Sequence, residues 1–240
     1  MQEASAQHRC DLVASFAARQ LILVLAGAIF LAYTHLRVRL KLEQRDLATF
    51  VADCSKQAGQ QLFGGVLMVV VGVLLAEGGL DPLAWYGAEY PFEIVLTTVF
   101  TSWLRTTTEA FFAWLQQRTS WESLAPFNRF GQYGPVPGTF RWSWYWAQML
   151  QAVVLIGVCA RLFSVLLIVA SLALPTSYSP VLLLARAWYH SGLSCEERTA
   201  LTLYAMPVLG DAVQFIIIDQ IQRYKQPPRP GPENLALVVR

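Results

Sequence analysis

The chain has 240 residues, of which 55% are hydrophobic and only 14% are charged, and its formal net charge is +2. Soluble domains carry about 25% charged residues, because water must solvate their surface. This composition excludes a water-soluble globular domain, and a basic stripe with interleaved aromatics, as nucleic-acid binding would need, is not found. We predict an all-α integral membrane bundle of about five transmembrane helices in the lipid bilayer, formed by residues 1–240 as one domain.

The apolar segments predict where these helices lie, because about 20 apolar residues are needed to cross about 30 Å of hydrocarbon. Backbone polar groups in lipid must be satisfied within the chain, so each segment is expected to be helical. The predicted helices cover about 20–36, 57–76, 90–117, 147–174 and 199–224. Between them lie a loop at 37–56 and a loop at 118–146, and a proline-rich tail follows at 225–240.

Several residues predict details of these helices. The first segment allows either a cleavable signal peptide or a retained anchor, and we favour the anchor because the apolar run continues to Leu36. Asp53 is placed to cap the second helix, and Pro91 falls in the first turn of the third. Pro207 is expected to kink the fifth helix, and residues Val181 to Tyr189 to form a short amphipathic piece on the surface.

The residues Trp142 to Trp146 are interpreted as an interfacial segment before the fourth helix, because aromatic rings favour the headgroup zone. Gly65 and Gly72 lie two turns apart on the second helix and are candidates for a close helix contact. Cys10 and Cys195 fall on the same predicted side of the membrane, and the sequence leaves open whether a disulfide joins them.

Lys and Arg are distributed unevenly between the two predicted sides, and cytosolic loops normally carry their excess. With five crossings, one side collects twelve of them and the other side four. The richer side has Arg37, Arg39, Lys41, Arg45, Lys56, Arg118, Arg129, Arg141, Arg223, Lys225, Arg229 and Arg240, and the poorer side has Arg9, Arg19, Arg186 and Arg198. We therefore predict a luminal N-terminus and a cytosolic C-terminus.

Six ionisable residues fall inside the predicted helices, where charges usually face the bundle interior and pair. They are Glu93, Arg105, Glu109, Arg161, Asp211 and Asp219. Arg105 and Glu109 are four residues apart on one helix and are expected to pair. Arg105, Arg161 and Asp211 are predicted at similar depths, about 16 to 22 Å from the luminal ends, so we expect Asp211 to pair with Arg161 or Arg105.

These charges allow two interpretations, structural pairing between helices or an ion or proton pathway. Five helices without an inverted repeat argue against a secondary transporter. The three histidines, His8, His35 and His190, are scattered, and neither a metalloprotease motif nor a nucleophile elbow occurs. We therefore predict a protein that is not an enzyme and has no cofactor or metal.

The order and spacing of several short motifs resemble the STIMATE family over residues 53 to 224. They begin with Asp53-Cys54-Ser55-Lys56-Gln57, Asp81-Pro82, Trp85-Tyr86 and Glu93. They continue with Gln116-Gln117, Trp121-Glu122-Ser123-Leu124, Gly131-Gln132-Tyr133-Gly134, Gln148 and Arg161. They end with Pro207, Asp211, where the family usually has Asn, then Gln214-Phe215 and Asp219.

The resemblance implies a non-enzymatic adaptor in the endoplasmic reticulum, or in the vacuolar or another endomembrane. Its animal members promote store-operated calcium entry by binding the STIM calcium sensor, so a STIM-like calcium sensor is an implied partner. The long charged tail of those proteins is not matched by the short segment after Tyr224. Two alternatives stay open: a small ion or proton channel or transporter, and a structural subunit of a larger membrane complex. The oligomeric state does not follow from the sequence.

Overall fold

The computed structural model describes residues 10, 27–28, 34–36, 39–40, 45–75, 80–136, 138–175 and 178–222. Over these ranges the regular structure is helical, as the sequence predicts. Two long helices are α2 (Leu47–Leu75) and α3 (Pro82–Thr119). Two further rods are continuous runs of segments: α5 (Trp142–Leu150), η4 (Gln151–Val158) and α6 (Cys159–Leu172), and then α8 (Cys195–Thr199), η5 (Ala200–Ala205) and α9 (Met206–Gln222). The short elements are η3 (Glu122–Leu124), α4 (Ala125–Asn128) and α7 (Pro180–Tyr189).

Three of the described helical runs are long and apolar enough to cross a membrane, namely Leu47–Leu75, Trp142–Leu172 and Cys195–Ile221. Large apolar side chains cover their outer faces; Leu62 and Leu166, for example, are each 63% exposed. Such exposure suits contact with lipid rather than with water. The chain is therefore a membrane protein built on a helical bundle, as its composition predicts.

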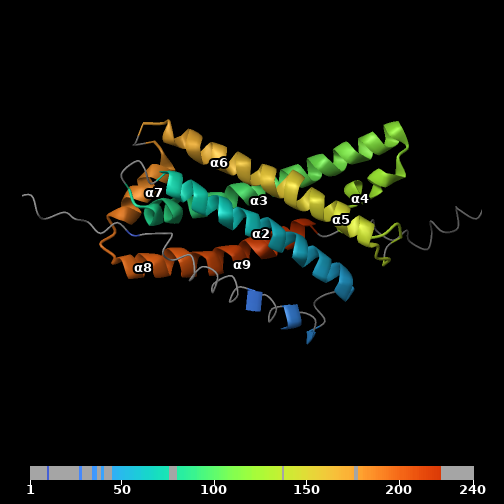
Figure 1. The fold of residues 1–240 in the computed structure, drawn as a ribbon, viewed down its shortest axis with the longest axis horizontal. Coiled ribbons are helices and arrows are strands. Elements are labelled where there is room, and N and C mark those ends of the chain that lie inside the picture. The colour runs from blue at the N-terminus through green and yellow to red at the C-terminus, as the bar shows by residue number, and fades with distance from the viewer. Residues whose placement is uncertain are drawn as a thin grey trace, which may run out of the picture.

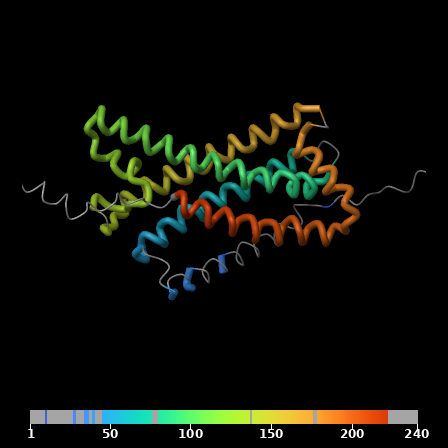
Figure 2. Tube along the Cα trace, turned by 180° about the vertical axis from the view of Figure 1, so that it is seen from behind, coloured from blue at the N-terminus to red at the C-terminus, as the bar shows by residue number. Residues whose placement is uncertain are grey.

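The helix α3 lies among these three runs and packs against α2, α6 and α9. Its 38 residues are long enough to cross a bilayer, but several charged side chains lower its apolarity. Of these, Glu89 and Glu93 are buried against the other helices. Figures 1 and 2 show α3 and α6 crossing each other along the long axis of the molecule.

The helix α2 begins ten residues earlier than predicted, at Leu47. Its first turn is capped by Asp46, whose carboxylate accepts a hydrogen bond from the backbone N–H of Thr49 at 3.0 Å. The prediction that Asp53 caps this helix is therefore wrong, because Asp53 lies inside it. Part of the predicted loop 37–56 is also helical, since its polar side chains face other elements rather than water.

The helix α3 also begins earlier than predicted, at Pro82. Asp81 caps it by accepting a hydrogen bond from the backbone N–H of Ala84 at 2.7 Å, and Pro82 occupies the first turn, where its missing N–H costs nothing. Pro91 consequently lies in the helix interior rather than in the first turn. The aromatic residues Trp85 and Tyr86 extend the helix because both are buried in the bundle.

The fourth predicted helix begins at Trp142, so the residues Trp142 to Trp146 form its first turns rather than a separate interfacial segment. Its middle, η4, is π-helical. There the Ala152 carbonyl accepts a hydrogen bond from the Gln60 side-chain amide at 2.6 Å. A Cβ at Gly157 would lie 2.9 Å from Gln60 Cγ, so the missing side chain makes room for this contact. The widened helix is thus joined to α2.

The last helical run contains a second π-helical segment, η5, which ends two residues before Pro207. Proline lacks a backbone N–H and its ring crowds the preceding turn, so a wider turn accommodates it. The short helix α7 occurs where a helical piece was predicted. Its buried residues Val181 and Ala185 pack with Trp85 of α3 and Ile168 of α6, so one face of α7 belongs to the core.

The loops gather at the two ends of the bundle as the sequence predicts. Figure 1 shows α7 and α8 at one end, and α4 and the start of α5 at the other. The start of α2 lies at the α4 end as well, since Arg45 beside it contacts Asp219 near the end of α9. The predicted helix 20–36 falls mostly outside the described residues, with only 27–28 and 34–36 described as helical. The predicted tail 225–240 lies outside them entirely.

Candidate functional site

The carboxylate of Asp53 is the centre of a buried polar cluster at the α4 end of the bundle. Its Oδ2 lies 2.7 Å from Nη1 of Arg45, and its Oδ1 lies 3.1 Å from Nζ of Lys56. The hydroxyl of Tyr133 donates a hydrogen bond to Oδ1 at 2.7 Å. We call the following residues the Asp53 cluster: Arg45, Asp53, Lys56, Phe130, Tyr133, Gln148 and Asp219. Three strong contacts to one carboxylate make a rigid junction.

The ammonium group of Lys56 is completely buried, which is costly unless its charge is compensated. Besides the ion pair with Asp53, its Nζ lies 3.9 Å from the ring centre of Phe130 and 4.8 Å from that of Tyr133. Gln148 adds a carbonyl oxygen at 3.5 Å. The aromatic faces and oxygens replace the water that the ammonium has lost.

The side chain of Gln148, on α5, fixes the loop that carries Tyr133. Its Oε1 accepts a hydrogen bond from the backbone N–H of Gly131 at 2.8 Å, and its Nε2 donates to the carbonyl of Gln132 at 2.7 Å. Gly131 has a φ of 87°, a left-handed conformation that favours glycine. A Cβ at Gly134 would lie 2.6 Å from the Thr139 carbonyl oxygen. Both glycines are therefore required by the shape of this loop.

Arg45 connects the beginning of α2 to the end of α9. Besides Asp53, it contacts Asp219, with Nη1 3.0 Å from Oδ1 and Nη2 3.3 Å from Oδ2. Nearby, the hydroxyl groups of Ser55 and Tyr145 are 3.0 Å apart and join α2 to α5. The sequence did not identify Arg45 as a site residue. A basic residue directly before the acidic residue Asp46, at the start of a helix, was a signal for it.

Burial, together with the negative charge and hydrogen bond of Asp53, raises the pKa of the Tyr133 phenol above its usual value. The phenol therefore stays protonated and donates its hydrogen bond. Gln57, next to Lys56, is also buried, but neither polar atom of its amide has a hydrogen-bond partner among the described residues. The motif residue Gln57 thus lies beside the Asp53 cluster without a side-chain hydrogen bond to its described residues.

A second polar layer lies deeper in the bundle and centres on Arg161 of α6. Its Nε lies 3.4 Å from Oε1 of Glu93 on α3, and its Nη2 donates to Oε1 of Gln61 on α2 at 3.0 Å. Gln61 in turn donates to Gln214 of α9 at 2.9 Å. A Cβ at Gly64 would collide with the guanidinium, so this glycine admits Arg161 to the core. Four helices therefore meet in this layer.

The structure gives Arg161 an ion-pair partner, Glu93, that the sequence did not predict. The carboxylate in ion-pair contact with Arg161 is that of Glu93, and Asp211 accepts a hydrogen bond from the hydroxyl of Tyr90 at 2.6 Å. Arg105 lies at the level of the Asp53 cluster, with its guanidinium 5.6 Å from the ring centre of Phe130. Depths counted from apolar segment ends did not indicate Glu93 as a partner, because α3 begins eight residues before the predicted start. The predicted pair of Arg105 and Glu109 is confirmed, at 3.2 Å.

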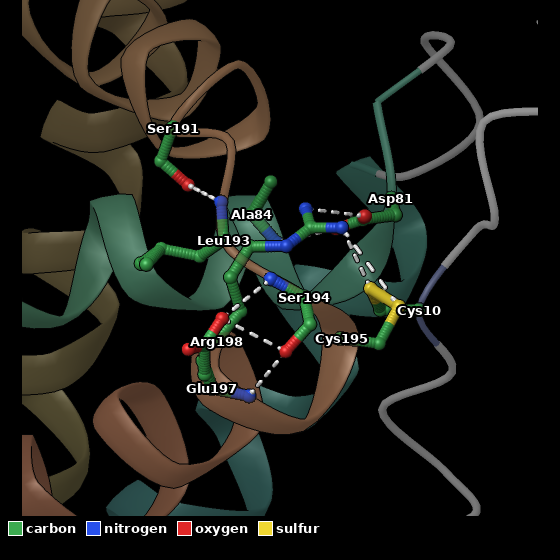
Figure 3. Close-up of a disulfide and its surroundings, with 9 residues drawn as sticks. All are labelled: Cys10, Asp81, Ala84, Ser191, Leu193, Ser194, Cys195, Glu197 and Arg198. Carbon is green, nitrogen blue, oxygen red and sulfur yellow. Dashed lines mark hydrogen bonds and ion pairs between the residues drawn. A yellow bond between two sulfur atoms is a disulfide. The ribbon is translucent and has the colours of Figure 1, made fainter.

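At the opposite end of the bundle, a disulfide joins Cys10 to Cys195, whose Cα atoms are 5.6 Å apart. This decides the alternative that the sequence left open. Figure 3 shows Arg198 between the disulfide and Asp81. Nη1 of Arg198 lies 2.9 Å from Oδ2 of Asp81, so this ion pair also joins α8 to the beginning of α3.

The arrangement is suited to holding helices together. Asp53, Lys56, Tyr133 and Gln148 direct their polar atoms to one another and to the backbone of one loop. Among the described residues, no group of three or more His, Cys, Asp or Glu side chains could hold a metal ion. Asp53, Lys56, Tyr133 and Gln148, which lie far apart in the sequence, are brought together here.

No protein-family model, curated protein or solved structure matches this chain.

Proposed function

We propose that this chain is a non-catalytic membrane adaptor that regulates a partner through helix–helix contacts, similar to the STIMATE family. The observation that carries the proposal is that residues of the family-like motifs are used for contacts within the bundle. Asp53, Lys56, Tyr133 and Gln148 are buried and contact one another, as a rigid scaffold requires. A catalytic or ion-binding site would instead direct such groups toward a bound molecule.

The proposed location is the endoplasmic reticulum or a related endomembrane, with the Asp53 cluster at the cytosolic end. Disulfides form and persist in oxidising compartments, which supports a luminal position for the end that carries Cys10 and Cys195. The Lys and Arg distribution supports the same orientation. These two arguments are independent, because one rests on thiol chemistry and the other on the charge of the loops.

The proposed partner is a STIM-like calcium sensor, and the regulated process is store-operated calcium entry. A lipid-exposed face for such a contact is available where α3 and α6 cross. Trp103 and Phe163 are largely exposed there, with their ring centres 6.3 Å apart. Exposed aromatic side chains are frequent anchors of protein interfaces.

The test uses cells from which the chain has been removed. Calcium entry after store depletion is expected to fall, and wild-type protein is expected to restore it. The double variant Trp103→Leu with Phe163→Leu remains lipid-compatible and is expected to restore it poorly, whereas Leu62→Ala on the outer face of α2 serves as the matched control. Unchanged calcium entry without the chain, and no calcium sensor found by proximity labelling, would contradict the proposal.

A second candidate function, a small ion or proton channel, is favoured by one observation. Glu93, Arg161, Gln61 and Gln214 form a continuous line of polar contacts across four helices in the bundle interior. Purified protein in liposomes distinguishes the two candidates. Robust ion flux that is abolished by Gln61→Leu, which interrupts this line, would support the channel and refute the adaptor, whereas flux no greater than in empty liposomes is expected for the adaptor.

A further inference from the structure

The two sulfur atoms of the Cys10–Cys195 disulfide have different surroundings. Cys10 is 4% exposed, whereas Cys195 is only partly buried. Nη2 of Arg198 lies 2.8 Å from Sγ of Cys10 but 3.8 Å from Sγ of Cys195 (Figure 3). One sulfur is therefore the more accessible to an attacking thiolate, and the other lies against a cation.

The guanidinium of Arg198 is held in place by groups other than the disulfide. Its Nη1 lies 2.9 Å from Oδ2 of Asp81, while Oδ1 of Asp81 accepts the capping hydrogen bond from Ala84 at the start of α3. The first turn of α8 is fixed by reciprocal hydrogen bonds between Ser194 and Glu197. Arg198 is consequently ordered before any reaction at the sulfurs, so its charge stays beside Cys10.

We propose that the Cys10–Cys195 disulfide is a site of thiol–disulfide exchange whose substrate is a dithiol reductant. A thiolate of the dithiol attacks Sγ of Cys195 and forms a mixed disulfide there. The Cys10–Cys195 bond breaks, and its electron pair leaves on Sγ of Cys10 as a thiolate that Arg198 stabilises.

The second thiol of the reductant completes the exchange. It attacks its own sulfur in the mixed disulfide, releases Cys195 as a thiolate and closes the reductant into a cyclic disulfide. Two electrons pass from the dithiol to the cysteine pair, and the two protons of the dithiol are available to the two cysteine thiolates. Oxidation of the dithiol and reduction of the pair therefore balance.

The exchange controls the covalent attachment of Cys10 to α8. Cys10 is bonded to α8 at one end of the bundle, and Arg45 contacts Asp53 and Asp219 at the other end. Cys10 and Arg45 are therefore held at opposite ends of the bundle. Reduction removes the covalent attachment of Cys10 and leaves the ion pairs of Arg45 in place.

The first experiment identifies the attacked sulfur. The full-length protein in detergent micelles carries Cys54→Ser and Cys159→Ser, so that only the bridging pair reacts. It is treated briefly with glutathione, acid-quenched, alkylated and analysed by mass spectrometry. Glutathione is expected on Cys195 and the alkyl group on Cys10. Glutathione mainly on Cys10, or a disulfide that reacts only after the protein is unfolded, would overturn the proposal.

The second experiment measures the role of Arg198 through the rate of reduction by dithiothreitol. Arg198→Gln alone would leave the buried carboxylate of Asp81 without its ion-pair partner. The variant is therefore Arg198→Gln with Asp81→Asn. A hydrogen bond to a charged group is worth about a tenfold change in rate, so reduction is expected to slow about tenfold. Arg198→Lys should lie between this variant and the wild type.

Arg186→Gln, an exposed position on α7, is the matched control and should leave the rate unchanged. Gel filtration identifies the variants that fold. A rate within twofold of the wild type in the folded double variant would overturn the role of Arg198, and misfolding of that variant leaves the glutathione experiment to decide the proposal.

Discussion

Arg161 of α6 forms an ion pair with Glu93 of α3, and the guanidinium Nε lies 3.4 Å from the carboxylate Oε1. Both side chains are buried, and the hydroxyl of Thr97 donates a hydrogen bond to Oε1 of Glu93 at 2.9 Å. The hydroxyl of Thr97 is in turn 3.1 Å from that of Ser164 on α6. The two helices that cross in Figure 2 are therefore joined by a polar contact at their interface.

The ion pair predicts how substitutions of its two members combine. Arg161→Gln or Glu93→Gln leaves one buried charge without its partner, and each is expected to cost about 3–5 kcal/mol of stability. The double variant should lose less than either single variant, because neither charge then remains. Thermal unfolding in detergent measures the four proteins. A double variant that loses as much as the sum of the singles would contradict the pairing.

Asp211→Asn is a useful comparison for that pair. An amide oxygen can still accept the hydrogen bond from Tyr90, so a small loss of stability is expected. If this substitution were as damaging as Glu93→Gln, then Asp211 would be a main partner of Arg161, as the sequence analysis expected.

The surroundings of Gly64 and Gly72 on α2 predict that alanine is tolerated at Gly72 but not at Gly64. A Cβ at Gly64 would collide with the Arg161 guanidinium, which Glu93 and Gln61 hold in place. A Cβ at Gly72 would meet its nearest atoms, in Glu89 and Pro82, at an ordinary 3.5 Å. Gly64→Ala should therefore lower the melting temperature and Gly72→Ala should not, as differential scanning fluorimetry can measure. Equal effects would place Arg161 elsewhere.

The Asp53 cluster predicts a graded loss of stability. Asp53→Ala removes the partner of the buried Lys56 and is expected to cost about 3–5 kcal/mol. Tyr133→Phe removes one hydrogen bond to a charged acceptor, so about 1.5–3 kcal/mol is expected. Asp219→Ala removes one of the two carboxylates that contact the partly exposed Arg45, which keeps Asp53, and should cost least. Chemical denaturation in detergent measures the order, and a loss for Tyr133→Phe above that for Asp53→Ala would contradict it.

The orientation predicts where an added sugar chain is accepted. An Asn-X-Ser/Thr acceptor placed at 191–193, beside α8, is expected to be glycosylated because that end is proposed to face the lumen. An acceptor placed at 134–138 should remain unmodified. Glycosidase-sensitive gel shifts of the full chain in microsomes report both. The reverse pattern would invert the orientation.

The disulfide predicts a loss of stability on removal of its sulfurs. Replacing Cys10 and Cys195 together by Ser frees a chain segment closed over 185 residues, and about 2–5 kcal/mol is expected to be lost. Cys54→Ser with Cys159→Ser is the control for the substitution itself. Melting temperatures with and without a reductant provide the measurement, and a reductant should not affect the Cys10→Ser, Cys195→Ser variant.

The helical segments could be predicted from the sequence, but their beginnings could not. Apolar residues locate the parts of helices that face lipid, because each side chain in contact with hydrocarbon must itself be apolar. The N-terminal parts of α2 and α3 that were not predicted contain buried polar or aromatic side chains, such as Asp53, Lys56 and Tyr86, which pack against other elements. Asp53 was therefore expected at a helix terminus, although it lies inside α2.

The residues of the candidate site could be selected from the sequence, but their contacts could not. Asp53, Lys56, Tyr133 and Gln148 were all expected to matter, yet no spacing indicated that they form one cluster. Arg105 and Glu109 were paired correctly, because a separation of four residues on one helix fixes their proximity. No comparable sequence spacing predicts which residues of two different helices are in contact.

The sequence by itself determined that this protein lies in a membrane as a bundle of helices, and at which end each loop lies. Hydropathy and chain length suffice for this, because water and lipid act on each segment separately. Only the tertiary structure decided that Glu93 faces Arg161, that Tyr133 reaches Asp53 and that Cys10 bonds to Cys195. These contacts depend on how each helix is rotated and shifted against its neighbours, which is settled by packing over the whole bundle.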